Sequence, residues 1–264
     1  MKIREAIVAL EQFAPLSLQD GYDNAGLQIG LTEDAELSGA LLSLDVTEDV
    51  LDEAVERGCN LVVSHHPLLF HAPKQITGAD YVQRCIVKAI KQDITIYSAH
   101  TNLDNAPGGV SWRMAELLGL KDCHVLEAKG LPAPWTEAGA GVIGELAEEM
   151  EREDFIALVK ELFEADSVRY NSWTGERVKR VALCGGSGAF LIPKAVAAGA
   201  DVFLTGEIGY HRFFGLEDSI QLMEIGHYES EQYTLKLLHD ILTQPDPTLP
   251  VSYTSVETNP INYL

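Results

Sequence analysis

Short apolar runs alternate with amphipathic stretches along most of the chain. The apolar runs predict buried strands over residues 39–46, 61–64, 94–99, 141–146, 168–171, 181–184, 201–205 and 220–225. Helical spacing of apolar residues predicts helices over residues 3–13, 48–57, 81–92, 110–118, 155–163 and 228–238, with Thr47 as one N-cap. This alternation is typical of an α/β fold in which helices cover mixed, largely parallel sheets.

A break in composition divides the predicted elements into two lobes. Residues 126–134 are rich in Gly, Pro and Ala, and the strand–helix alternation restarts after them. We therefore expect a second α/β lobe at residues 126–215, inserted into a first lobe that consists of residues 1–125 and 216–264.

Composition excludes several classes of protein. The chain has 264 residues, 46% of them hydrophobic, which is enough for a real core. It carries 19 basic and 40 acidic side chains, and the net charge of −21 argues against constitutive binding of nucleic acid.

The chain lacks an apolar run of roughly 20 residues, so we expect no membrane span. Its start lacks a signal-peptide core and its four cysteines lack CxxC spacing, which predicts a cytoplasmic protein with reduced thiols.

Histidines stand where predicted strands end. His65 and His66 follow the run at 61–64, and Pro67 favours an extended backbone at His66. Neighbouring side chains on an extended chain point to opposite sides, so this pair suits two metal ions better than one. His100 follows the run at 94–99 in the same way. Ligands bind at the carboxyl ends of strands in open α/β sheets, which makes these positions candidate site residues.

A third strand end carries His227 and Glu231, which lie four residues apart where the helix predicted over 228–238 begins. This spacing places both side chains on one helix face, where they suit a single ion. The alternative is a solvated first helical turn with a favourable acidic residue near its N-terminus. Together, the three segments predict a mixed histidine and carboxylate metal centre.

Glycines at positions 185, 186 and 188 follow the strand predicted at 181–184. The turn departs from both the GxGxxG pattern and the P-loop pattern. The glycines either allow a tight strand-to-helix turn or present backbone amides to a substrate phosphate.

Six segments of the chain resemble a known family. They are DNAGL at 23–27, SHHP at 64–67, HTNLD at 100–104, CGGSG at 184–188, LTGE at 204–207 and GHYESE at 226–231. In these segments, which span nearly the whole chain, the protein resembles the NGG-one-interacting-factor-three-like family. Bacterial members of that family are labelled GTP cyclohydrolase I type 2 homologues.

The resemblance implies a two-lobed α/β protein with a dinuclear metal centre. Its metal ligands would be His65, His66, Asp104, His227 and Glu231. The resemblance also implies a toroidal homohexamer whose centres face an interior cavity. Some relatives carry a long extra domain between the lobes, which at 264 residues is absent here or reduced to the linker near residue 131.

Two further histidines are candidates for the same site. His211 lies where many members of the family place histidines near the site, so it is a candidate for contact with the substrate or with a ligand. His100 is either a catalytic proton shuttle or a strand-end histidine hydrogen-bonded to a ligand carboxylate.

The donor types define the expected chemistry. Three imidazoles and two carboxylates suit two divalent ions of Zn, Fe, Mn, Co or Ni, whereas a calcium site would need more oxygen. Paired ions can activate a bridging water, so we expect a metal-dependent hydrolase of a nucleotide-like or phosphorylated small molecule. The alternatives are a non-catalytic metal-handling or regulatory binding protein, and a scaffold hexamer.

Overall fold

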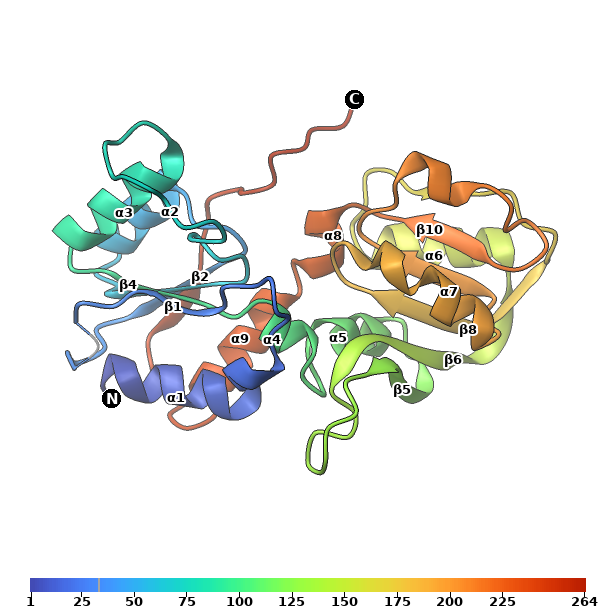
Figure 1. Ribbon diagram of the computed structural model, residues 1–264, viewed down its shortest axis with the longest axis horizontal. Helices are drawn as coiled ribbons and strands as arrows, with labels where there is room; N and C mark the ends of the chain where they lie inside the picture. Colours follow the sequence, from blue (N-terminus) through green and yellow to red (C-terminus); the bar gives the residue numbers. More distant parts are fainter. Residues whose placement is uncertain (33) are drawn as a thin grey trace. The chain divides into compact units, whose positions relative to one another are not determined.

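The computed structural model describes residues 1–32 and 34–264 (Figure 1). Contacts within the chain define two compact units. The first unit consists of residues 1–103 and 234–260, and the second of residues 104–233 and 261–264. Each unit has its own sheet, helices and apolar core. In the part of the chain that the structure describes, every helix is too short or too polar to traverse a lipid bilayer.

The described residues of the first unit form one sheet with the strand order β1-β4-β3-β2-β11. The strands are β1 (Gly26–Ile29), β2 (Ala40–Ser43), β3 (Leu61–Ser64), β4 (Thr95–Ser98) and β11 (Val251–Tyr253). Neighbouring strands from β4 to β11 run parallel, and β1 pairs antiparallel with β4. The carboxyl ends of β2, β3 and β4 therefore lie at one edge of the sheet.

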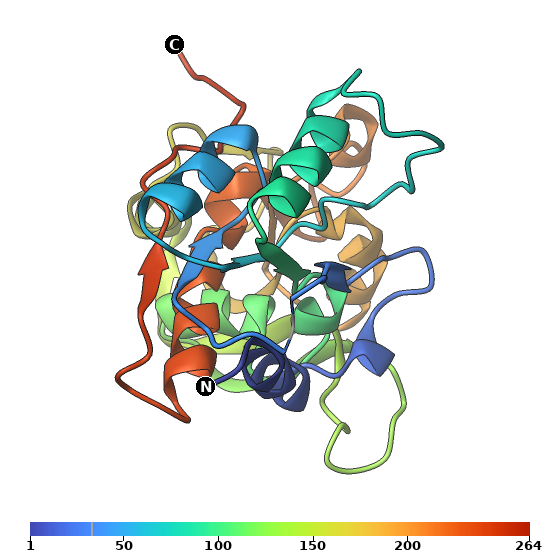
Figure 2. The same ribbon diagram turned by 90° about the vertical axis from the view of Figure 1, so that its left-hand side faces the viewer.

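Helices cover both faces of this sheet (Figures 1 and 2). They are α1 (Ile3–Phe13), α2 (Glu48–Glu56), α3 (Tyr81–Lys91) and α9 (Thr234–Thr243), with the short η1 (Leu16–Leu18). Apolar side chains of α2 and α3 pack on Leu41, Val62 and Ile96 of the sheet, while α1 and α9 lie on the other face. Helices α2 and α3 have side-chain N-caps. The Thr47 side chain accepts a hydrogen bond from the Val50 backbone amide, and the Asp80 side chain accepts one from the Gln83 backbone amide.

The described residues of the second unit form a sheet with the strand order β5-β6-β8-β9-β10-β7. The strands are β5 (Lys121–Ala128), β6 (Gly139–Glu151), β7 (Arg169–Tyr170), β8 (Arg177–Cys184), β9 (Val202–Thr205) and β10 (Gln221–Glu224). Strands β8, β9 and β10 run parallel, and the other pairs are antiparallel.

Helices also lie on both faces of the second sheet (Figure 1). The helical segments of this unit are α5 (Val110–Leu117), α6 (Arg152–Leu162), η2 (Gly188–Leu191), α7 (Ile192–Ala197), η3 (Tyr210–Phe213) and α8 (His227–Glu231). Helices α5 and α6 contribute Met114, Phe155 and Val159 to one core cluster, and α7 contributes Ile192 and Ala195 to another. The four-residue helix α4 (Thr101–Asp104) ends on the first residue of the second unit.

The predicted α/β class with mixed, helix-covered sheets is confirmed. The first sheet is largely parallel, as predicted, whereas the second is more antiparallel than predicted. This difference arises because residues 126–134, taken from their composition as a lobe boundary, overlap β5 and the loop that follows it. Strands β5 and β6 form an antiparallel pair, so this loop connects two neighbours within one sheet.

The units have boundaries at 103/104 and 233/234, which differ from the predicted boundaries at 125/126 and 215/216. Strand pairing explains the difference. Strand β5 pairs with β6, and β10 pairs with β9, so both strands belong to the second sheet. His227 and Glu231 therefore belong to the second unit rather than to the expected metal-binding first lobe.

The single helix predicted over 228–238 is wrong, because the structure has two helices there. Helix α8 ends at Glu231 and α9 begins at Thr234. Side chains between them bind the end of α6: the Gln232 amide donates to the Phe163 carbonyl, and the Tyr233 hydroxyl donates to the Leu162 carbonyl. These bonds hold residues 232–233 in the second unit, and the chain returns to the first unit immediately afterwards.

Candidate metal site

Three imidazoles gather at the carboxyl edge of the first sheet. His65 and His66 follow β3, and His100 follows the neighbouring strand β4. One possible ligand atom from each ring lies within 4.8 Å of those of the other two, so this group can hold a metal ion. The ring centroids of His65 and His66 are 5.0 Å apart, and that of His100 lies 5.3 Å and 5.7 Å from them. His65 is fully buried, while the other two rings are partly exposed.

Each of these rings is oriented by a contact to Nδ1. The Ala99 carbonyl lies 2.7 Å from Nδ1 of His65. A carboxylate oxygen of Asp45 lies 2.9 Å from Nδ1 of His66. A carboxylate oxygen of Asp23 lies 2.7 Å from Nδ1 of His100. These contacts commit one nitrogen of each ring to the protein, so Nε2 is the nitrogen that suits a metal ion.

The two carboxylates stay ionised at neutral pH. Burial alone would raise the pKa of Asp23, but hydrogen bonds from His100 and Thr101 outweigh it and lower that pKa to about 2. Burial likewise opposes ionisation of Asp45, and the hydrogen bond from His66 overcomes it, so the pKa of Asp45 is lowered. Both groups therefore face their imidazoles as hydrogen-bond acceptors.

A second group of donors lies at the start of α8 in the second unit. Nε2 of His227 lies 3.1 Å from a carboxylate oxygen of Glu231, one helical turn later. Nδ1 of the same ring lies 3.1 Å from Glu207, and Glu207 accepts a 2.5 Å hydrogen bond from the Ser187 hydroxyl. Glu231 is buried, which confirms the predicted pairing of these side chains on one helix face and contradicts the alternative of a solvated first turn.

Asp104 and Glu231 both lie near the buried thiol of Cys184. Burial raises the pKa of the Cys184 thiol to about 12, and the negative charges of Asp104 and Glu231 add to this effect. Both carboxylates therefore lie near one buried thiol of the second unit. Two acidic oxygens and one imidazole of this unit supply the donor types that divalent transition metals prefer.

The glycine turn after β8 packs against Glu231. A Cβ atom at Gly186 would lie 2.3 Å from the Glu231 carboxylate, and Gly186 has a φ of +59°. The amide of Gly188 is already bonded to the Thr205 hydroxyl, and the Gly186 carbonyl accepts from the amides of Gly206 and Glu207. These contacts favour the structural explanation of the glycines over a phosphate-binding one.

The five ligands implied by the family resemblance are divided between the units. His65 and His66 belong to the first unit, and Asp104, His227 and Glu231 belong to the second. His211 is exposed on η3, and its ring contacts Tyr210 and Phe214.

Sequence reasoning missed three acceptors as site residues: Asp23, Asp45 and Glu207. A signal existed for two of them, because Asp45 and Glu207 stand two residues after the ends of β2 and β9. Asp23 lies in the DNAGL segment that resembles the family, but its partner His100 lies 77 residues away in the sequence.

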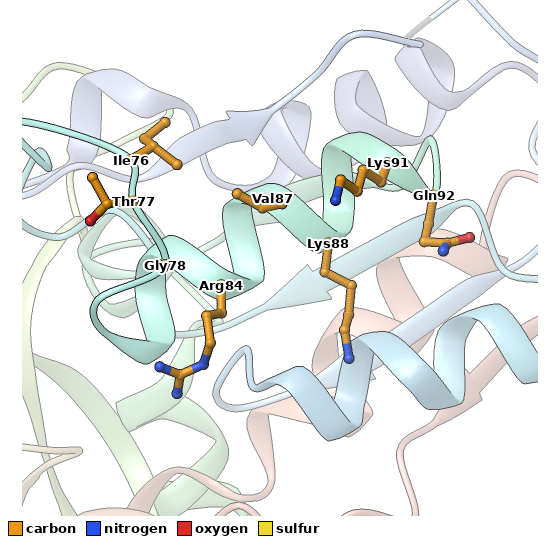
Figure 3. A pocket seen from close by; sticks show the side chains of 8 residues that line it. All are labelled: Ile76, Thr77, Gly78, Arg84, Val87, Lys88, Lys91 and Gln92. Atoms are coloured by element: carbon orange, nitrogen blue, oxygen red, sulfur yellow. The ribbon is translucent and has the colours of Figure 1, made fainter.

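A hollow of about 550 Å³ on the first unit is a separate candidate site (Figure 3). It is lined by Ile76, Thr77, Gly78, Arg84, Val87, Lys88, Lys91 and Gln92. Two of its cations already form ion pairs with carboxylates of α2. Nε of Arg84 lies 2.7 Å from a carboxylate oxygen of Glu48, and Nζ of Lys88 lies 2.7 Å from a carboxylate oxygen of Asp52. In Figure 3 both side chains extend toward that neighbouring helix. The charges of Arg84 and Lys88 are therefore already balanced by carboxylates of the same unit.

The family assignment follows from comparison with known proteins. The model of the Duf34/NIF3 family (NGG1p interacting factor 3) matches residues 1–260. The chain belongs to this family. The Duf34/NIF3 protein is 37% identical over 232 residues to a Clostridium perfringens protein named GTP cyclohydrolase 1 type 2 homolog, covering 88% of this chain and 87% of the relative. It is 32% identical to a Lactococcus lactis protein of the same name, with 98% of each chain covered.

Solved structures agree with this assignment. The Staphylococcus aureus protein SA1388 is 30% identical, with a TM-score of 0.88 over 100% of this chain and 99% of that one. A Bacillus cereus protein related to NIF3 is 26% identical, with a TM-score of 0.89 over the same shares. The resemblance seen in the sequence motifs is thereby confirmed for the whole Duf34/NIF3 fold.

Proposed function

We propose that this Duf34/NIF3 protein binds two divalent metal ions and hydrolyses a nucleotide-like or otherwise phosphorylated small molecule. The observation that carries the proposal is the cluster of three imidazoles at the strand ends, each with Nδ1 already bound to a protein oxygen. Histidines that ligate metals typically use their second ring nitrogen in this way.

His65, His66, Asp104, His227 and Glu231 are the proposed ligands. Mixed nitrogen and oxygen donors suit Zn, Fe, Mn, Co or Ni. When bound, two such ions lower the pKa of a water ligand and stabilise a developing oxyanion. The Nδ1 contacts of His65, His66 and His227 keep these three ligand rings in place.

His100 is the proposed group for proton transfer. Asp23 holds its Nδ1, so Nε2 can take a proton from water and pass it to a leaving group. The alternative, a third imidazole ligand, is distinguished by metal content, because a proton-transfer group leaves metal binding intact when it is replaced by Gln.

Aromatic side chains beside His100 support a ligand with a planar ring. The ring centroid of Phe70 lies 6.0 Å from that of His100. The ring centroid of Tyr22 lies 6.5 Å from that of Phe70. Both side chains are exposed, so their faces are available for stacking. The names of the relatives, GTP cyclohydrolase 1 type 2 homolog, agree with a nucleotide-like substrate.

Elemental mass spectrometry on the untagged protein tests the metal proposal. We expect about two ions per chain in the parent and fewer in Glu231→Ala, because that variant removes a buried carboxylate. Glu148→Ala, which removes an exposed carboxylate, is the control and keeps the parent content. A folded protein that takes up no Zn, Fe or Mn contradicts the proposal.

Turnover is tested separately on the metal-loaded protein. A panel of nucleotides and phosphoesters is assayed with the parent and with His100→Gln. We expect hydrolysis by the parent and a loss of about 100-fold or more in the variant at unchanged metal content. If the loaded parent hydrolyses nothing, the metal-handling alternative is favoured, and it predicts that mild chelators remove the ions without unfolding the protein.

A homohexamer in the cytoplasm completes the proposal. The family resemblance supports the hexamer, and four free cysteines, three of them buried, suit a reducing compartment. Light scattering coupled to size exclusion tests the assembly, which should have six times the 28.9 kDa mass of one chain.

A further inference from the structure

A hollow of about 530 Å³ opens on the second unit. Its walls come from two segments, residues 168–172 around β7 and residues within 210–217, which include η3 and the loop after it. The volume lies within the range of roughly 300–1,000 Å³ that is usual for small-molecule sites. The described residues that line it include no candidate metal ligand, so the hollow is a separate site.

Hydrogen bonds fix both walls of this hollow. The buried Asn171 side chain bonds to the Ile220 carbonyl and to the Leu222 amide, which ties the first wall to the sheet. The backbone amide of Thr174 donates to the Glu217 carbonyl at 2.8 Å, which links the segment after the first wall to the second wall. The walls are therefore in place before a ligand binds, as is usual for small-molecule sites.

Aromatic rings make up much of the lining. Tyr170, Tyr210 and Phe214 all line the hollow, and their exposed fractions are 54%, 66% and 60%. The ring centroids of Tyr210 and Phe214 are 5.4 Å apart, and the two ring planes are inclined at 73°, so their faces point in different directions. The face of an aromatic ring is negative and attracts a cation. Several rings around one space are typical of sites for organic cations.

The lining already holds one organic cation, which belongs to the protein itself. The guanidinium carbon of Arg169 lies 5.4 Å from the centroid of the Phe213 ring. Nη1 of Arg169 lies 2.6 Å from a carboxylate oxygen of Glu224, whose other oxygen accepts from the Ile208 amide at 2.7 Å. An aromatic face and a carboxylate thus hold this guanidinium together, and its charge is balanced within the second unit.

Glu217 supplies the same combination to the other rings of the hollow. One of its carboxylate oxygens accepts a 3.3 Å hydrogen bond from the Gly215 amide. A carboxylate has about four lone-pair sites, so Glu217 keeps the capacity to face a ligand. The net charge of −21 on the chain also attracts cations and repels anions.

We propose that this hollow binds a small organic cation of the quaternary ammonium class. The rings of Tyr170, Tyr210 and Phe214 contact the methylated head group, and Glu217 balances its charge. A methylated head group suits the rings better than a bare ammonium, because a bare ammonium is strongly hydrated and aromatic faces replace its water poorly. The inference is independent of the proposed metal centre.

A titration of the protein with choline, in the presence of a chelator, tests the proposal. We expect saturable binding that shifts the NMR signals of the Tyr170, Tyr210 and Phe214 rings. The neutral carbon analogue of choline, in which a quaternary carbon replaces the nitrogen, has nearly the same shape and no charge. We expect it to bind roughly 3- to 30-fold more weakly than choline.

Two variants test the residues that the proposal names. Phe214→Leu keeps an apolar side chain but removes one ring face, so the affinity for choline should fall roughly 3- to 30-fold. Glu217→Gln keeps the shape and removes the charge, so it should weaken binding of choline and leave binding of the neutral analogue unchanged. Phe190→Leu and Glu161→Gln are the matched controls, because they change an exposed ring and an exposed carboxylate elsewhere on the second unit.

Three results would overturn the inference. They are the absence of saturable choline binding to the folded parent, equal affinity for choline and its neutral analogue, and an unchanged affinity in Phe214→Leu. Phe214 is exposed, so thermal unfolding should show that its variant stays folded. Because the chelator keeps the protein free of metal, each of these results leaves the metal proposal untouched.

Discussion

Ser255 donates both its backbone amide and its hydroxyl to the carboxylate of Glu53, at 2.9 Å and 2.6 Å. The Thr254 hydroxyl donates to the same carboxylate, and Arg57 forms an ion pair with it. Glu53 is buried on α2, while Ser255 follows β11, so these bonds tie a C-terminal segment of the first unit to one of its early helices.

This carboxylate makes the stability of the first unit depend on pH. Burial opposes its ionisation, but hydrogen bonds from Ser255 and Thr254 lower the pKa of Glu53 from 4.5 to about 2. Its stabilisation is therefore complete above about pH 4.5 and is lost as the pH falls toward 2. In urea unfolding, Glu53→Gln should be about 2 kcal/mol less stable than the parent at pH 7.

The difference between parent and Glu53→Gln should shrink steadily as the unfolding series moves from about pH 5 to pH 2. Glu56→Gln, at an exposed position on the same helix, should follow the parent at every pH. A difference that stays constant with pH would show that the carboxylate contributes through its shape and not through its charge.

Gly186→Ala should displace a proposed ligand. The new Cβ would collide with Glu231 and would force a residue with a side chain into a φ of +59°. The strain costs about 1 kcal/mol, and the displaced carboxylate should lower the metal content. Gly199→Ala is a matched control, because Gly199 has a φ of +68° with nothing within 4 Å of its Cβ position. Equal metal loss in both variants would argue against the collision.

Asn171→Ala should loosen the edge of the second sheet. The buried Asn171 side chain donates to the Ile220 carbonyl at 3.1 Å and accepts from the Leu222 amide at 2.7 Å. Its removal leaves two buried backbone groups of the β10 region without their partners, which costs about 2–3 kcal/mol. Thermal unfolding measures the loss. Ser172→Ala, at the exposed neighbouring position, should change stability by about 0.5 kcal/mol or less.

His211→Ala should leave the metal content unchanged. The ring is exposed and contacts Tyr210 and Phe214, and these side chains are not metal ligands. The measurement is elemental analysis beside the parent. A loss of metal would assign His211 to the ligand environment, and a loss of turnover alone would assign it to substrate binding.

Much of the fold follows from local pattern. The helix over residues 3–13 and the N-cap at Thr47 are confirmed, and the apolar runs at 61–64 and 94–99 contain β3 and β4. These elements have strong periodicity and buried residues throughout. Strand β5 was not predicted, because an edge strand with largely exposed side chains lacks the apolar run that marks a buried one.

The acceptors of the site depend on sheet register, which local pattern does not contain. Ser43 of β2 lies opposite Ser64 of β3, and this pairing brings Asp45 beside His66. A shift by one residue would turn Asp45 to the other side. Histidines at strand ends are visible in the sequence, whereas the partners that orient them are set by which strands become neighbours.

The order in which the chain is synthesised is not the order in which its units can be completed. The first unit needs residues 234–260, including α9 and the edge strand β11, to cover its core and finish its sheet. Residues 104–233, which are all of the second unit except residues 261–264, lie together in the sequence and leave the ribosome earlier. During translation, the early strands of the first unit therefore cannot complete their sheet until after the second unit is able to fold. In ribosome-bound chains long enough for residue 233 to have left the exit tunnel while residues 234–260 are still inside it, we expect protease resistance in the second unit but not in the first.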